Sequence, residues 1–411
     1  MHREVLMEVY IGIDWSEQKH DVLFMNPAGQ TMLSFQMAHH RDGFLQLEEA
    51  RQELAVSTDH CLIGIETAHN LVIDFLWAWG YYQVYELPPS AVNRGRDRFK
   101  QSRARTDQSD AWVIADLLRT DLPNFHPWYP DSPLTRQIRA QVGLVLSLTR
   151  ESLRLSNQLR AVLLRYYPTA LRVFSGLDAF ITLEFVRTYP NPQAAVTLSL
   201  QEFRTFAQQH RYPRPDNLPK CFARLQANYP QTDPATVIAF QSTAVQLAGL
   251  LIQVLRAKQD TLNQLQDLFW QHPDCEIYHS LPGAGDLLEP ALLAHFGDDR
   301  RRFPTPAVVQ ALAGTCPVTD ASGKRRRIYF RLACDHDFRY ITQQWARASR
   351  KESDWAAVYY QQARLRGHSK SHALRCLANR WLAILWRLWQ DRSTYDEAYH
   401  QQQRLLHSRP R

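Results

Sequence analysis

The order of strand and helix patterns in the first part of the chain constrains the fold most strongly. Residues 8–14, 20–25 and 31–37 read as short apolar strands separated by turns, which predicts an antiparallel meander. Two segments with helical spacing then alternate with two apolar strands, at 43–54, 61–68, 71–80 and 81–87. We therefore expect an α/β domain at the start of the chain.

Later segments predict a different architecture. Apolar residues line one face of two long helices, at Ile138, Val142, Val145, Leu148, Leu155, Leu159 and Val162, and at Leu247, Leu251, Leu255, Leu262, Leu265 and Phe269. The two helices could pair as an antiparallel arm, form a dimerising coiled coil, or pack as an ordinary bundle within one subunit. Frequent prolines between them predict short helical pieces, and a mostly α-helical domain follows. The expected domains are 1–130, 131–270, 271–398 and a basic tail at 399–411.

Composition narrows the functional class. The 411 residues carry a net charge of +7, which suits a polyanionic partner better than a membrane. The first residues lack the apolar core of a signal peptide, and we expect no membrane span, so a cytoplasmic location is predicted. The six cysteines form no C-x-x-C pair, which suggests neither a zinc site nor a disulfide framework.

Carboxylates stand at places where the predicted fold would bring them together. The order of elements is that of an RNase H-like fold, in which the strands ending at Asp14 and Glu66 are neighbours. Asp107 and Asp110 lie three residues apart at the start of a helix, on one face. Any one of these acids could merely cap a turn or a helix. Together they predict a site for Mg²⁺, or for Mn²⁺, that could act on a phosphodiester.

A basic run precedes the second pair of acids. It contains Arg94, Arg96, Arg98, Lys100, Arg103 and Arg105. Such a run is often a solvated face, but its place beside the proposed phosphodiester site favours contact with nucleic-acid phosphates.

A second group of motifs lies in the last domain. Gly283 and Gly285 form a tight loop before a helix, where backbone N–H groups could hold a phosphate. Ser322 and Gly323 are followed by four cations, Lys324, Arg325, Arg326 and Arg327. A hydroxyl beside these cations could attack phosphorus while they stabilise the transition state. Composition alone favours a surface turn with a basic tail, and Thr319 and Cys316 are alternative nucleophiles.

These motifs, in this order, resemble the DEDD transposases of the insertion sequence 110 group. The resemblance runs from about residue 9 to about 398 and includes "YIGIDWSEQKHDV", "IGIETA", "RTDQSDAWVIADLL", "LPGAGDLLEPALLAHFGD" and "ALAGTCPVTDASGKRRRI". It implies a RuvC-like N-terminal domain with Asp14, Glu66, Asp107 and Asp110 as its acids. A coiled-coil segment would join this domain to a transposase domain whose nucleophile is Ser322. Arg105 stands where the family often has lysine, which keeps the charge but changes the hydrogen-bond geometry.

The resemblance also implies partners. Such recombinases act on DNA as homo-oligomers, here expected as dimers that form a tetramer, and the acids of one subunit complete the site around the serine of another. A structured noncoding RNA from the same element guides them. Two other functions remain open: a hydrolytic RuvC-like junction nuclease that uses only the acids and water, and a non-enzymatic nucleic-acid-binding module.

Overall fold

The computed structural model describes residues 8–66, 71–99, 107–227, 232–322 and 325–407. The chain forms two compact units, Met1–Asp131 and Ser132–Arg411. Each unit is described by itself. Lys100, Arg103, Arg105 and Lys324 lie outside the described residues.

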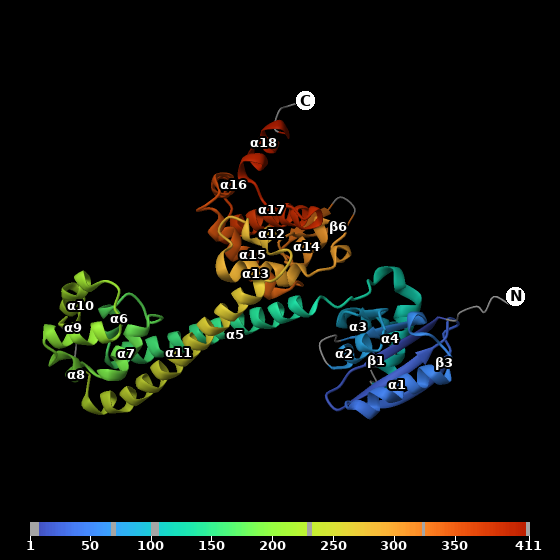
Figure 1. The fold of residues 1–411 in the computed structure, drawn as a ribbon, viewed down its shortest axis with the longest axis horizontal. Helices are drawn as coiled ribbons and strands as arrows, with labels where there is room; N and C mark the ends of the chain where they lie inside the picture. Colours follow the sequence, from blue (N-terminus) through green and yellow to red (C-terminus); the bar gives the residue numbers. More distant parts are fainter. Residues whose placement is uncertain (1–7, 67–70, 100–106, 228–231, 323–324, 408–411) are drawn as a thin grey trace. The chain divides into compact units, whose positions relative to one another are not determined.

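The first unit contains a mixed five-stranded sheet of order β3-β2-β1-β4-β5 (Figure 1). Its strands are β1 (Val9–Asp14), β2 (Lys19–Met25), β3 (Thr31–Ala38), β4 (Cys61–Ile65) and β5 (Val84–Glu86). β1, β2 and β3 are antiparallel neighbours, whereas β4 runs parallel to β1 and β5 parallel to β4. This is the predicted order, a meander followed by parallel strands.

Helices cover both faces of this sheet. They are α1 (Arg41–Glu53), α2 (Leu71–Ala78), α3 (Pro89–Phe99) and α4 (Asp107–Asp121), with 3₁₀ turns at η1 (Thr58–His60) and η2 (Leu122–Asn124). Because side chains alternate along a strand, Ile13 faces the core built with α1 and α2, whereas Tyr10 faces the core built with α4. Apolar burial on both faces explains why β1 and β4 are apolar almost throughout.

The second unit begins with an antiparallel pair of long helices, here called the arm (Figure 1). They are α5 (Pro133–Tyr166) and α11 (Pro234–Phe269). Val142 near the start of α5 shares a core with Phe269, and Leu159 near its end shares another with Leu251. The two helices therefore pair within one chain. By length and apolar composition α11 could cross a membrane, which the sequence did not predict, but its buried side chains pack in these protein cores.

Short helices fill the proline-punctuated segment between α5 and α11. They are α6 (Ala170–Val173), α7 (Phe180–Thr188), α8 (Pro192–Val196), α9 (Leu200–Gln209), η3 (Pro215–Asn217) and α10 (Leu218–Leu225). Two of them begin at a capping side chain: Asn191 caps α8, and Ser199 forms a reciprocal capping box with Glu202 at the start of α9. Buried aromatic rings, including Phe185 and Phe203, hold these pieces together.

The C-terminal domain is mostly helical, as expected, and adds a β-hairpin that the sequence did not predict. Its elements are α12 (Cys275–His279), α13 (Gly285–Phe296), η4 (Arg300–Arg302), α14 (Pro306–Leu312), β6 (Val318–Ser322), β7 (Arg325–Tyr329), α15 (His336–Ser349), α16 (Asp354–Leu365), α17 (Lys370–Asp391) and α18 (Glu397–His407). Helix α18 occupies most of the expected basic tail. Its first residue is anchored, because the Ser353 and Tyr395 hydroxyls donate to Glu397 at 2.9 Å and 2.7 Å.

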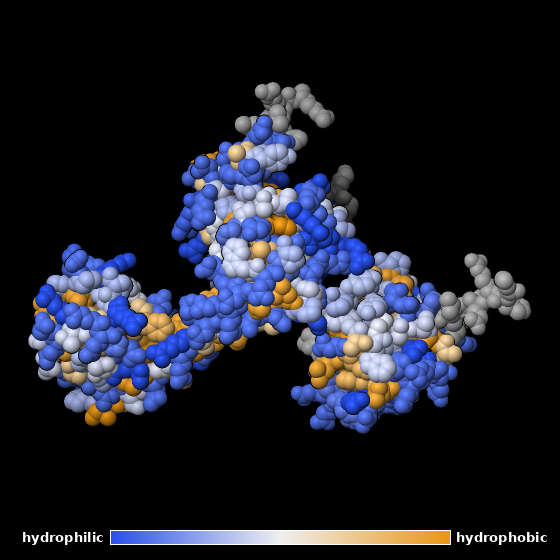
Figure 2. Space-filling view, in the orientation of Figure 1, coloured by the Kyte–Doolittle hydropathy of each residue, from blue (hydrophilic) through white to orange (hydrophobic). Residues whose placement is uncertain are grey.

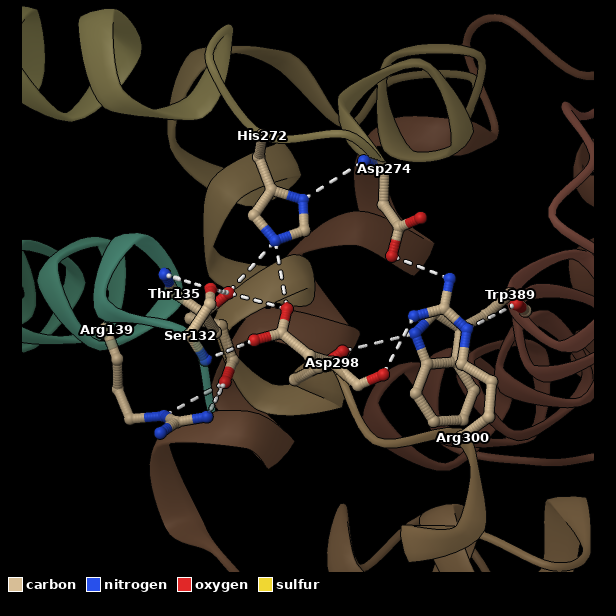
Figure 3. Close-up of polar contacts among 10 residues, drawn as sticks. Ser132, Thr135, Arg139, His272, Asp274, Asp298, Arg300 and Trp389 are labelled. Carbon is tan, nitrogen blue, oxygen red and sulfur yellow. Dashed lines mark hydrogen bonds and ion pairs between the residues drawn. The ribbon is translucent and has the colours of Figure 1, made fainter. Parts of the chain in front are cut away.

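A polar network joins the base of the arm to this domain (Figure 3). The Asp298 carboxylate accepts hydrogen bonds from the Ser132 N–H at 2.6 Å and the Thr135 hydroxyl at 2.7 Å, and it lies 3.0 Å from His272 Nε2. Nearby, Arg300 donates to Asp274 at 2.6 Å and to the Trp389 carbonyl at 3.0 Å. Although burial raises the pKa of Asp298, hydrogen bonds from His272, Ser132 and Thr135 together hold that pKa below its ordinary value.

Candidate active site

Two of the predicted acids stand side by side at one edge of the sheet. Ile13 in β1 is the register partner of Ile65 in β4, and the two strands are parallel. Asp14 and Glu66 are the next residues on these strands, which in a parallel pair lie about 4.8 Å apart. Both carboxylates therefore leave the sheet at its carboxyl edge and on the same face.

Two glycines let α4 approach this face closely. Gly12 and Gly64 precede the two acids by two residues, so they lie on the same face of the sheet. A β-carbon on Gly12 would lie 1.9 Å from the Ala111 carbonyl oxygen, and one on Gly64 would lie 2.7 Å from the Ile114 side chain. The first turns of α4 therefore pack directly against the backbone of β1 and β4 at these two glycines. Asp110, the residue before Ala111, is brought to the strand ends.

An arginine lies within this group of acids. Arg96 on α3 donates from Nε and Nη2 to the two carboxylate oxygens of Asp110, at 2.6 Å and 2.5 Å. The hydrogen bonds to Asp110 raise the pKa of the Arg96 guanidinium, and the negative charges of Asp110, Glu66 and Asp14 raise it further. One guanidinium therefore lies within electrostatic reach of three carboxylates.

The remaining residues of this unit that were predicted to bind metal or nucleic acid differ in their surroundings. Asp107 is the first residue of α4, and its side chain lies outside the described part of the chain. Arg94 is exposed on α3, and Arg98 is paired with Asp121 at 2.9 Å. Arg96, predicted to contact nucleic acid, holds Asp110 in this structure.

The structure adds an acid that sequence reasoning missed. Asp21 in β2 is the antiparallel register partner of Asp14. Its buried carboxylate accepts a hydrogen bond from Gln36 Nε2 at 3.2 Å. Like charges directly opposite each other on neighbouring strands are destabilising unless a cation offsets them. The available signal was an acid inside an otherwise apolar strand.

The donor set fits a hard divalent cation. Asp14, Glu66, Asp110 and the adjacent Asp21 offer only carboxylate oxygens, which are the ligands that suit Mg²⁺ and Mn²⁺. The guanidinium of Arg96 among them shows that this edge of the sheet attracts positive charge.

The glycine loop of the second unit is engaged by a carboxylate. Gly283 has φ of +70°, and its N–H donates to Glu352 Oε2 at 2.6 Å. Gly285 begins α13 with φ of +59°. Both glycines adopt a left-handed conformation that other residues rarely adopt. The N–H of Gly283 that was predicted to hold a phosphate is bound to an anionic side chain in this structure.

Ser322 lies at the end of β6, beside the cations of β7. Ser322 is the register partner of Arg325, and Asp320 that of Arg327. Directly opposite and alternate residues share a face, so Arg325 and Arg327 lie on the face of Ser322, whereas Arg326 lies on the other. All of these residues are exposed. The hairpin thus presents a hydroxyl and two guanidinium groups together.

The base of the hairpin is held by a cation–π stack. The guanidinium groups of Arg339 and Arg375 each lie 4.5 Å from the ring centroid of Phe330, the residue after β7. Arg339 also donates to the Arg331 carbonyl at 2.5 Å. These contacts attach the exposed hairpin to helices α15 and α17.

A further cluster was not anticipated from the cysteine spacing. His368, His372 and Cys376 place one potential ligand atom each within 4.8 Å of one another. Nitrogen and sulfur ligands favour softer ions such as Zn²⁺ over Mg²⁺. The spacing of four residues between successive members was the available signal.

Comparison with known proteins identifies the family. A family model described as Transposase matches residues 11–168, and one described as Transposase IS116/IS110/IS902 family matches residues 275–361. The mini-circle putative transposase for IS117 of Streptomyces coelicolor is 30% identical over 398 residues, which cover 95% of this chain and 96% of that protein. An uncharacterized 42 kDa protein of insertion element IS900 from Mycobacterium paratuberculosis is 25% identical over 413 residues, covering 95% and 98%. The chain therefore belongs to the IS110 family of transposases.

Proposed function

We propose that this transposase is a Mg²⁺-dependent DNA recombinase that cuts and rejoins DNA through a covalent phosphoserine at Ser322. The main support is that Asp14 and Glu66 end neighbouring parallel strands and that Arg96, which binds Asp110, lies within electrostatic reach of both. The exposed hairpin that pairs Ser322 with Arg325 adds a nucleophile for which a hydrolytic nuclease has no use.

In the proposed reaction, Ser322 Oγ attacks the scissile phosphorus and forms a P–O bond. The bond from phosphorus to one deoxyribose oxygen breaks, and that oxygen leaves as a hydroxyl end, so the proton lost by Ser322 is balanced by the one that the leaving oxygen gains. The hydroxyl end of the other DNA then attacks the phosphoserine, which joins the two DNAs and restores the serine hydroxyl. Arg325 and Arg327 would stabilise the charge of the pentacovalent transition state. Asp14, Glu66, Asp107 and Asp110 would hold Mg²⁺, which when bound lowers the pKa of the attacking hydroxyl and stabilises the leaving oxygen.

The proposed partners are element DNA, target DNA and a structured noncoding guide RNA, in the cytoplasm. RNA guidance rests on the family resemblance. A net charge of +7 suits two nucleic-acid partners. Assembly into dimers and tetramers is supported by leucines left exposed on the arm, among them Leu153 at 63%. Figure 2 shows apolar patches that interrupt the polar surface of the arm.

One experiment separates this proposal from a hydrolytic nuclease. Purified protein, Mg²⁺, RNA transcribed from the element's flanking region and labelled element-junction DNA are incubated, and a denaturant-resistant protein–DNA adduct is measured. We expect the adduct in the wild type and its loss in both Ser322→Ala and Asp14→Ala. Thr319→Ala removes the alternative nucleophile, which lies on the opposite face of the same strand, and it should keep the adduct. Free cleaved ends without an adduct, still formed by Ser322→Ala, would establish hydrolysis.

A further inference from the structure

Arg96 occupies a place that a metal-binding site would need. Its guanidinium donates hydrogen bonds to both carboxylate oxygens of Asp110 and interacts electrostatically with Glu66 and Asp14. The contact is partly shielded, because the side chains of Arg96 and Asp110 are 21% and 13% exposed. A bidentate arginine–carboxylate pair with limited solvent access is among the stronger ion pairs in proteins.

A divalent cation and this guanidinium compete for the same oxygens. Both oxygens of Asp110 are already hydrogen-bonded to Arg96, and a cation beside them would also meet the repulsion of a fixed positive charge. Mg²⁺ requires near-ideal octahedral geometry, which leaves little room for a guanidinium fork on the same carboxylate.

We infer that Arg96 is a resident counter-cation of the acid cluster in the metal-free protein and that it moves off Asp110 when a divalent cation binds. This inference rests on the proposed metal site and adds a residue that sets its affinity. Arg96 would offset the mutual repulsion of Asp14, Glu66 and Asp110 without metal. Once released, it remains on α3 next to the site, where it can contact a DNA phosphate.

The chain offers a matched control for this inference. Arg98 lies two residues further along α3 and pairs with Asp121 on α4, so it joins the same two helices. That pair is more exposed, at 52% and 27%, and Asp121 stands at the other end of α4 from Asp110. Removing Arg98 changes the same charge and the same helix contact without touching the acid cluster.

The test is a Mn²⁺ titration of the full-length protein without nucleic acid, followed by the electron paramagnetic resonance signal of free Mn²⁺. We expect Arg96→Met to bind Mn²⁺ about tenfold more tightly than the wild type, because a like charge is removed from the site. Arg96→Lys, which keeps the charge but loses the fork, should lie between them. Arg98→Met should match the wild type, and Asp110→Asn should bind weakly.

The outcomes distinguish the two levels of the proposal. Equal or weaker binding by both Arg96 variants, with clear binding by the wild type, would overturn the counter-cation role and leave the metal site standing. Absence of site-specific binding in every variant would overturn both. Circular dichroism checks that each variant is folded. If Arg96→Met does not fold, the Mn²⁺ affinity of Arg96→Lys tests the counter-cation role.

Discussion

Gly12 in β1 lies so close to α4 that a β-carbon on it would come within 1.9 Å of the Ala111 carbonyl oxygen. This contact places Asp110, the neighbour of Ala111, beside the strand that ends at Asp14. The acid cluster therefore depends on a residue without a side chain as much as on the acids themselves.

Gly12→Ala should destabilise the first unit and weaken metal binding together. The added methyl group must push α4 from the sheet, and such overpacking costs about 1–3 kcal/mol. Chemical denaturation and Mn²⁺ titration measure the two effects. Gly143→Ala is the matched control, because a β-carbon there meets no atom within 4 Å, and alanine favours the helix. Unchanged Mn²⁺ affinity in Gly12→Ala would show that helix placement is not critical.

Some features of the fold and of the acid cluster could be predicted from the sequence, and others could not. The positions of Asp14 and Glu66 followed from local patterns, because apolar strands of known length end at these residues. Two features of the site depend on packing between segments that are distant in sequence: the contact of Gly12 with Ala111 and the hydrogen bonds of Arg96 to Asp110. The hydrophobic periodicity of a single helix or strand does not encode such packing. The β6–β7 hairpin was missed because its strands are exposed and charged, so they lack the alternation that marks a half-buried strand.

The two faces of the hairpin should contribute unequally to strand cleavage. Arg325 lies opposite Ser322, and Arg326 lies on the other face. We expect Arg325→Ala to slow adduct formation about 100-fold at saturating DNA, as loss of a transition-state donor does, and Arg326→Ala to slow it only a few-fold. Equal losses in the two variants would mean that the cations act through net charge alone.

Acid should destabilise the first unit through His20. Burial lowers the pKa of His20 to about 4, and the charge of His39 contributes a smaller part of this shift. His20 Nε2 lies 2.8 Å from His39 Nδ1. As the pH falls, His20 takes up a proton in the unfolded chain, where its pKa is near 6.5, before it does so in the folded protein. The contribution of neutral His20 to the free energy of unfolding is therefore fully present above pH 6.5 and is lost as the pH falls towards 4. The slope for this group reaches about 1.4 kcal/mol per pH unit.

Denaturation of the wild type and of His20→Gln at pH 7 and pH 4.5 isolates this contribution. The loss of stability between the two pH values should be smaller in His20→Gln than in the wild type. His60→Gln, which removes another histidine of the same unit, should lose as much as the wild type. An identical loss in all three proteins would exclude His20 as the source.

Asp298 should be important for the attachment of the arm. Its carboxylate accepts hydrogen bonds from the first turn of α5 and contacts His272 after α11 (Figure 3). Asp298→Ala removes the acceptor of the Ser132 N–H and the carboxylate that Thr135 and His272 share, although those two side chains still contact each other. We expect a loss of about 2–3 kcal/mol in the free energy of unfolding. Asp299→Ala, which removes an ion pair with Arg301 and the cap on the Arg301 N–H, should lose about 1 kcal/mol. Similar losses at both positions would contradict a special role for Asp298.

Glu352 should weaken phosphate binding at the glycine loop. Its carboxylate accepts the Gly283 N–H at 2.6 Å, so a DNA phosphate must displace it and overcome its charge. Glu352→Gln keeps the shape of the side chain and removes the charge. We expect its affinity for a short DNA duplex to rise about threefold to tenfold, with a salt dependence steeper by about one phosphate contact.

The control for this prediction is Glu276→Gln, which removes the same charge from an exposed position on the neighbouring helix α12. Fluorescence anisotropy at several salt concentrations measures both variants. A gain in Glu352→Gln well above that in Glu276→Gln would locate the effect at the Gly283 N–H, because both variants change the net charge equally. Equal gains would mean that general electrostatic attraction accounts for the change and that the loop holds no phosphate.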